Sequence, residues 1–214
     1  MITCQALLTE LQTTQLNDPE GVTFSQSELL IALNAALNML ALLRPDATAK
    51  HAVITMQRGA RQQIPDDGNR LIRVISNVRS SGVSGQVIRL VDKADLDSSS
   101  RSWISASGLL VKEYMFDPRI PKQFFIYPNV PPSTQIEIEY SAQPKTVTAD
   151  NINRSLPVDA MYAQPLQELM MYKLLSGDAT NGNSGANHLQ VASELLGVKA
   201  EQDNRLSAAR KSSS

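Results

Sequence analysis

Residues 25–45 read Ser-Gln-Ser-Glu-Leu-Leu-Ile-Ala-Leu-Asn-Ala-Ala-Leu-Asn-Met-Leu-Ala-Leu-Leu-Arg-Pro, and they predict one long helix. Ser25 stands three residues before Glu28. This is the capping-box spacing, at which the hydroxyl and the carboxylate each accept a free backbone N–H. The helix is expected to end at Arg44-Pro45, because proline disfavours helical geometry in the residue before it.

This helix is apolar over most of its circumference. One stripe with roughly heptad spacing consists of Leu30, Leu33, Leu37 and Leu40. Further apolar positions widen the stripe: Leu29, Ala32, Ala36 and Leu43. Such a helix must be covered on most sides, which leaves two interpretations open. The helix is either the centre of the chain's own core, or a neighbouring subunit supplies part of its cover.

From about Lys50 to Pro144 the pattern changes to strands. Six segments are rich in β-branched or aromatic residues and are separated by clusters of Gly, Pro, Asp and Ser: 51–57, 70–78, 86–92, 109–116, 123–127 and 134–141. Ile136-Glu-Ile-Glu-Tyr140 alternates strictly, which indicates a strand with one buried face. No helical segment of crossover length separates these strands, so we expect an antiparallel sandwich or rolled sheet.

Helical patterns flank this β-rich region. A short apolar helix is expected over residues 2–15, and apolar residues recur at helical spacing over 159–175 and again from about Ala186. The order predicts an α+β fold, in which the N- and C-terminal helices form a bundle beside the central sheet. We expect a single domain over 1–214, with N-terminal helices in 1–45, strands in 50–144, C-terminal helices in 156–204 and a polar tail in 205–214.

The charge and hydropathy of the chain argue against two classes of partner. Twenty basic and 21 acidic residues leave a net charge of −1, whereas proteins that hold nucleic acid through its phosphates carry a basic excess. The longest apolar stretch, residues 29–43, contains two asparagines and is shorter than the roughly 20 residues that a bilayer span needs. We therefore expect no membrane and no tight binding of DNA.

No recognisable catalytic or metal-binding motif stands in the sequence. His51 begins a strand and His188 opens the last helix, and a surface or capping role is expected for both. Cys4 is the single cysteine and is expected to be a semi-buried thiol on the first helix. The acidic run 92–97 lacks the glycine and the later glutamate of an EF-hand loop, so we expect a short capped helix or a turn there. The prediction is a protein without enzymatic activity, cofactor or metal.

Trp103 is the only tryptophan, and it lies in the β-rich region. A lone tryptophan in such a region is usually a core or interface anchor, and a structural anchor is the role expected here. The alternative is a platform for a sugar in a carbohydrate-binding β-sandwich. Loss of glycan binding in Trp103→Ala would favour that alternative.

Short segments from Leu7 to about Gly197 form a recognisable series. They are Ser27-Glu-Leu-Leu30 with Leu33-Asn-Ala-Ala36, Gly59-Ala-Arg-Gln-Gln-Ile-Pro-Asp-Asp-Gly68, Leu71-Ile-Arg-Val74 with Asn77, Gly85-Gln-Val-Ile-Arg89 with Leu96-Asp97, Trp103, Tyr114-Met-Phe-Asp117, Pro121-Lys-Gln-Phe-Phe-Ile-Tyr-Pro128, and Leu156-Pro157 before Tyr162. In order and spacing they resemble the head-to-tail adaptor (connector) proteins of short-tailed, podovirus-like bacteriophages.

The resemblance implies a structural role in the virion. Subunits of this family form a closed, dodecameric ring below the portal, extend the DNA channel and present a landing surface for the tail nozzle or tail fibres. The expected partners are copies of the chain itself, the portal protein and tail proteins, with DNA only passing through the lumen. The protein would be made in the host bacterial cytoplasm. Another phage part, such as a head- or tail-completion protein, is the second hypothesis.

Within the adaptor hypothesis, three sets of residues are candidate contacts. The subunit interface or core helix would use Leu30, Leu33, Leu37 and Leu40. Portal docking would use basic residues of the tail: Arg205, Arg210 and Lys211. Tail-facing loops would present Asp66, Asp67, Asn69, Asn129 and Pro131.

Overall fold

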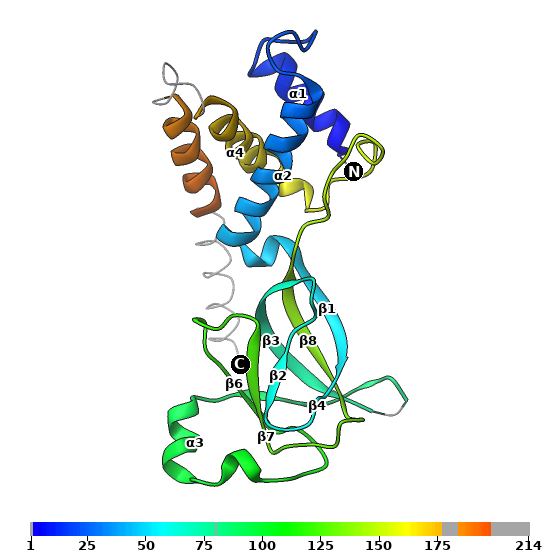
Figure 1. The fold of residues 1–214 in the computed structure, drawn as a ribbon, viewed down its shortest axis with the longest axis vertical. Coiled ribbons are helices and arrows are strands. Elements are labelled where there is room, and N and C mark those ends of the chain that lie inside the picture. The colour runs from blue at the N-terminus through cyan, green and yellow to red at the C-terminus, as the bar shows by residue number, and fades with distance from the viewer. Residues whose placement is uncertain (1, 80, 177–183, 198–214) are drawn as a thin grey trace, which may run out of the picture. The chain divides into compact units, whose positions relative to one another are not determined.

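The computed structural model describes residues 2–79, 81–176 and 184–197, and the chain divides into two compact units (Figure 1). A helical unit combines Met1–Ala47 with Pro144–Ser214, and a β unit consists of Thr48–Gln143. The α+β class predicted from the sequence is confirmed, with helices at both ends of the chain and strands between them. The organisation as a single domain stays a prediction.

The helical unit is a bundle built from both ends of the chain. Its elements are α1 (Cys4–Thr14), α2 (Gln26–Leu43), the short turn η1 (Pro45–Thr48), η3 (Ala160–Tyr162), α4 (Ala163–Leu175) and a helix of residues 184–197. Helix α2 lies beside α4 (Figure 1), and one hydrophobic core joins α1, α2, α4 and the helix of residues 184–197. Pro165 lies in the first turn of α4, where its missing N–H leaves no hydrogen bond unmade.

Helix α2 begins as predicted. The Ser25 hydroxyl accepts the N–H of Glu28, and the Glu28 carboxylate accepts the N–H of Ser25 at 2.8 Å, so both halves of the capping box are present. Arg44 is the C-terminal cap, one residue before Pro45. Both ends of α2 are therefore set by residues within a few positions of each other, and the sequence predicted both.

The interior of the helical unit holds most of the apolar surface of α2. Its buried residues are Leu29, Ala32, Leu33, Ala36, Leu37, Leu40 and Ala41. Helix α2 is long and apolar enough to cross a membrane by length and composition, but so are the core helices of globular units. Its burial among α1, α4 and the helix of residues 184–197 supports the interpretation as a core helix.

The β unit contains two four-stranded sheets, ordered β1-β8-β3-β4 and β2-β7-β6-β5. The strands are β1 (Ala49–Thr55), β2 (Arg61–Gln63), β3 (Gly68–Val78), β4 (Ser84–Val87), β5 (Arg89–Leu90), β6 (Glu113–Phe116), β7 (Gln123–Tyr127) and β8 (Gln135–Ala142), with the helix α3 (Lys93–Ser99) and the turn η2 (Trp103–Ser105) between β5 and β6. Only Ile88 separates β4 from β5, so one stretch of chain passes from one sheet into the other.

A single core fills the space between the two sheets, as a rolled sheet or sandwich requires. Both sheets supply it: Leu71, Ile136 and Ile138 come from the first, and Phe124 and Ile126 from the second. The prediction of an antiparallel arrangement holds for every pair of described strands except β5 and β6, which are parallel.

Two strand predictions need correction. Residues 86–92 do not form one strand, because the chain changes sheets at Ile88 and Asp92 already caps α3. The segment 109–116 becomes a strand only at Glu113. Strand β2 was not predicted, because its Arg-Gln-Gln residues carry no apolar alternation.

Candidate interaction surfaces

One face of α2 exposes large apolar side chains. Ile31 is 70% exposed and Leu42 is 75% exposed. Eleven residues make about three turns, so the two side chains project from the same side of the helix, with the exposed Asn38 between them. The predicted stripe lies elsewhere: Leu33, Leu37 and Leu40 are fully buried in the chain's own core. Leu30 is only partly buried. A contact between α2 and another subunit would therefore use Ile31 and Leu42 rather than that stripe.

The loop between α1 and α2 is held by one carboxylate. Asp18 accepts the backbone N–H groups of Val22, Thr23 and Phe24, at 2.8–2.9 Å. These hydrogen bonds, chiefly that from Phe24, hold the pKa of Asp18 below its ordinary value. Val22 is 86% exposed on this loop. The loop thus presents an apolar side chain on a backbone that is already ordered, which lowers the entropic cost of binding.

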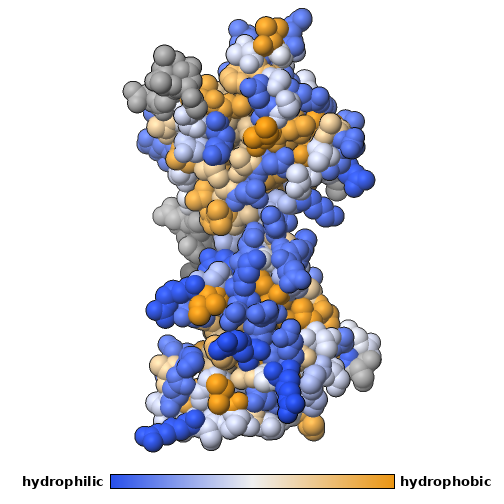
Figure 2. Space-filling view, viewed as in Figure 1, coloured by the Kyte–Doolittle hydropathy of each residue, from blue (hydrophilic) through white to orange (hydrophobic). Residues whose placement is uncertain are grey.

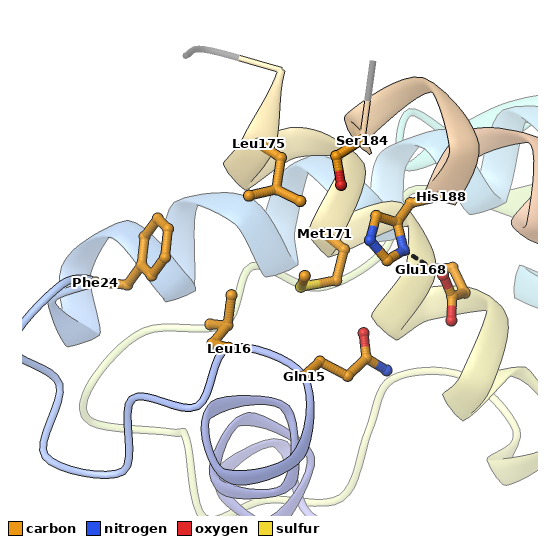
Figure 3. Close-up of a pocket in the computed structure, with 8 residues that line it drawn as sticks. All are labelled: Gln15, Leu16, Phe24, Glu168, Met171, Leu175, Ser184 and His188. Atoms are coloured by element: carbon orange, nitrogen blue, oxygen red, sulfur yellow. Dashed lines mark hydrogen bonds and ion pairs between the residues drawn. The ribbon is translucent and has the colours of Figure 1, made fainter. Parts of the chain in front are cut away.

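A pocket of about 590 Å³ opens in the helical unit (Figure 3). It is lined by Gln15, Leu16, Phe24, Glu168, Met171, Leu175, Ser184 and His188. The imidazole Nδ1 of His188 and the carboxylate of Glu168 lie 2.7 Å apart across two helices. A serine–histidine–carboxylate relay would also need a hydrogen bond from the serine to the imidazole. The described residues hold no hydrogen bond between Ser184 and His188. The pairing of His188 with Glu168 therefore links the helix of residues 184–197 to α4.

The two histidines therefore differ from each other. His188 is neither a surface residue nor a cap, as the sequence had suggested, but a half-buried partner of Glu168. Its true role needed α4 and the last helix to be adjacent, which sequence alone did not show. His51 does lie on the surface, on β1, with its ring nitrogens 3.7 Å from carboxylate oxygens of Glu137 and Glu139.

Trp103 is buried in the β unit. Its side chain is 3% exposed, and its indole N–H donates to Asp97 at 2.7 Å. The ring packs edge-on against Phe125, with centroids 6.1 Å apart, and Lys93 lies over its face. An indole buried in this way has no open face for a sugar, which argues against the carbohydrate-binding alternative.

The acidic run, predicted to be a short capped helix or a turn, forms a short capped helix. Asp92 caps α3 by accepting the N–H of Ala94. The Asp97 carboxylate accepts hydrogen bonds from Lys93 and from the indole of Trp103. Among the described residues no group of three or more His, Cys, Asp or Glu side chains could hold a metal ion. Cys4 is fully buried at the start of α1, and burial raises the pKa of its thiol.

The predicted tail-facing loops lie at opposite ends of β8. Asp67 accepts hydrogen bonds from the Tyr140 hydroxyl and the Gln143 N–H, beside the end of the strand. Asp66 is its neighbour in the same turn, and Asn69 follows in the first residues of β3. Asn129 and Pro131 precede the start of β8 instead. The two loops therefore cannot form one surface at a single end of the sheet. Arg205, Arg210 and Lys211 lie outside the described residues.

Exposed apolar residues lie on both units. Figure 2 shows scattered apolar patches on a mainly polar surface in both units. Among the described residues of the helical unit, the exposed large apolar ones are Val22, Ile31, Leu42, Leu43, Met161 and Val191. In the β unit they are Val53, Val83, Val87, Leu90, Ile104, Leu109, Leu110 and Ile120. Scattered apolar residues are ordinary on a protein surface, and only large contiguous patches by themselves mark sites that bind other proteins.

A family model described as SU10 adaptor protein matches residues 2–212. The chain belongs to the SU10 adaptor protein family. This match over nearly the whole length confirms the coarser part of the resemblance: the chain is a phage adaptor protein. The SU10 adaptor is thereby a structural component of a virion that interacts with other phage structural proteins. A search of curated proteins gives no match.

Proposed function

We propose that this SU10 adaptor is a ring subunit at the head–tail junction of a short-tailed bacteriophage. The ring, of twelve copies by the resemblance described above, would join the portal to the tail nozzle or tail fibres. Its lumen would extend the channel through which DNA leaves the head. The family match supports an adaptor role.

The observation that carries the proposal is the apolar row of Ile31 and Leu42. A helix that buries one side in a core and still exposes two large aliphatic side chains has a second surface to cover. Each such side chain gains roughly 1.5–3 kcal/mol when it is fully buried. A subunit in a closed ring presents two different complementary sides, one to each neighbour. The row on α2 is a candidate for one of these sides.

The near-neutral charge is compatible with a conduit. The net charge is −1. A strongly basic lining would hold passing DNA through phosphate contacts and the release of counterions. An adaptor that only guides DNA has no need of such contacts.

The first test is the assembly state. Native mass spectrometry and electron microscopy of the purified chain, alone and mixed with portal protein, are expected to show rings. A stable monomer that joins no portal ring at any protein or salt concentration would contradict the proposal. Ile31→Asp should fold but weaken ring formation at least tenfold. Gln26→Asp, at an exposed position in the first turn of the same helix, is the matched control and should assemble normally.

Portal docking by the C-terminal tail is tested separately. Removal of the residues after Asn204 deletes all three basic candidates, Arg205, Arg210 and Lys211. We expect the shortened chain to fold and form rings but to bind portal more weakly in sedimentation or pull-down measurements. Unchanged attachment would remove the docking role from this segment.

A further inference from the structure

Strand β1 is an open edge of its sheet. It pairs only with β8, through seven consecutive antiparallel pairs from Ala49↔Ser141 to Thr55↔Gln135, without a register shift. Five of its seven residues are exposed, which shows that the chain's own elements leave this strand accessible. Among the described residues, no strand pairs with its outer side.

The direction of its backbone groups follows from the pairing. The N–H of Met56, directly after β1, donates to the carbonyl of Thr134, so residue 56 faces β8. Residues of an antiparallel strand alternate between facing their partner and facing away. The peptide groups of Ala49, His51, Val53 and Thr55 therefore point outward. None of these four N–H groups donates to any described residue.

Soluble proteins usually protect such an edge with proline, a bulge or unpaired charges. β1 contains no proline and no bulge. Its one permanently charged residue, Lys50, is already paired with Asp67 at 2.9 Å. Val53 is 53% exposed. The outward backbone groups of β1 are therefore available to pair with another strand, as in β-strand addition.

The opposite edge of the same sheet is also open. It is formed by β4, which among the described strands pairs only with β3 and has one register shift, between Ser76 and Val78 of β3. The hydrogen bond from the Arg79 N–H to the Val83 carbonyl turns Val83 toward β3, so the peptide group of Ser84 points outward. Val83 and Val87 are both exposed, Val87 at 74%.

Topology and charge make the two edges compatible. The order β1-β8-β3-β4 is antiparallel at every step, so β1 and β4 run in opposite directions. A β4 strand added beside the β1 of the next copy would continue this alternation. The residues of β4 are Ser-Gly-Gln-Val, without charge, so no like-charge repulsion opposes Lys50 and His51.

We propose that β1 of one SU10 adaptor subunit pairs antiparallel with β4 of the next, which joins the sheets of neighbouring copies. This inference rests on the proposed ring and names one of its subunit contacts. The contact uses different edges on the two partners, and repetition by a closing rotation makes a ring. Outward peptide groups supply its hydrogen bonds, and exposed valines supply apolar contact.

The test removes one outward N–H without touching the sheet of the subunit. Val53→Pro deletes a donor that faces away from β8, a position where an edge strand tolerates proline. Val53→Thr keeps the N–H and the β-branched shape and is the matched control. Circular dichroism and thermal unfolding establish that each variant folds, and native mass spectrometry measures rings. We expect Val53→Pro to be folded with at least a tenfold loss of rings, and Val53→Thr to assemble normally.

A cross-link gives an independent readout if Val53→Pro fails to fold. Val53→Cys combined with Ser84→Cys should form covalent ladders up to the full ring under mild oxidation, while each single variant stops at dimers. Cys4 is buried and leaves the background low. Rings of Val53→Pro at the wild-type level, or rings of the double-cysteine variant without ladders, would overturn the β1–β4 contact while the proposed function stands. Absence of rings from the wild-type chain would overturn both.

Discussion

The side-chain amide of Asn34 binds both backbone groups of Val147, 113 positions later in the chain. The Val147 N–H donates to Oδ1 of Asn34, and the Asn34 Nδ2 donates to the Val147 carbonyl, each at 2.8 Å. This polar residue in a mainly apolar helix thus binds the segment after the β unit to α2. Val147 is buried, where backbone polar groups are almost always hydrogen-bonded.

We predict that Asn34→Ala destabilises the helical unit. The substitution leaves a buried N–H and carbonyl without partners, which costs about 1–3 kcal/mol. Asn38→Ala is the control, since Asn38 lies one turn further on the same helix and is exposed. Urea unfolding followed by circular dichroism measures the difference. Equal stability of the two variants would show that the Val147 bonds contribute nothing net.

Leu37 and Leu42 should respond in opposite ways to a negative charge. Leu37→Asp buries an unpaired carboxylate in the core of the helical unit and is expected to prevent folding. Leu37→Ala should fold but lose about 2–5 kcal/mol of stability. Leu42→Asp, at a position exposed in the isolated chain, should fold normally and weaken assembly. A soluble, normally assembling Leu37→Asp variant would mean that the core of this unit is wrongly assigned.

The cluster of Asp46, Arg44 and Tyr162 predicts that the free energy of unfolding falls at low pH. The Arg44 guanidinium binds both carboxylate oxygens of Asp46, and the Tyr162 hydroxyl donates to one of them. Burial by itself would raise the pKa of Asp46, but the hydrogen bonds from Arg44 and Tyr162 and the charge of Arg44 outweigh it and lower the pKa to about 2.

The sign of this effect follows from the lowered pKa. A carboxyl group that binds its proton less tightly when folded stabilises the fold above its ordinary pKa of about 4. That stabilisation is lost as the pH falls toward 2. Since about half of the Asp46 side chain is exposed, its contribution should be near 1 kcal/mol. Asp46→Asn should reduce stability at pH 7 and flatten the melting temperature between pH 4 and 2. An unchanged slope would assign acid sensitivity to other carboxylates.

Trp103 offers a spectroscopic test of the β unit. Asp97→Ala removes the acceptor of the indole N–H and one partner of Lys93. We expect a lower melting temperature and a red shift of tryptophan emission, because the ring packs less firmly in its site. Asp95→Ala, at an exposed position of the same helix, should leave both unchanged. Identical emission from the two variants would show that packing alone holds the ring.

The sequence predicted features that depend on residues close together in the chain. The capping box at Ser25, the aspartate cap of α3 and the strict alternation of residues 136–140 depend on neighbours a few positions apart. The capping box and the alternation predicted their elements correctly, and the acidic run was predicted as a capped helix or a turn. Fold class followed, because the order of helical and strand patterns is itself a sequence property.

Contacts between distant segments could not be read in this way. Three features depend on which elements become neighbours in space. They are the pairing of His188 with Glu168, the hydrogen bonds of Asn34 to Val147 and the positions of the two predicted loops at opposite ends of β8. The exposed row of α2 was missed for a related reason. A helix that is apolar nearly all round has no polar face to orient it, so packing against α4 and α1 selects Leu33 for the core and leaves Ile31 outside.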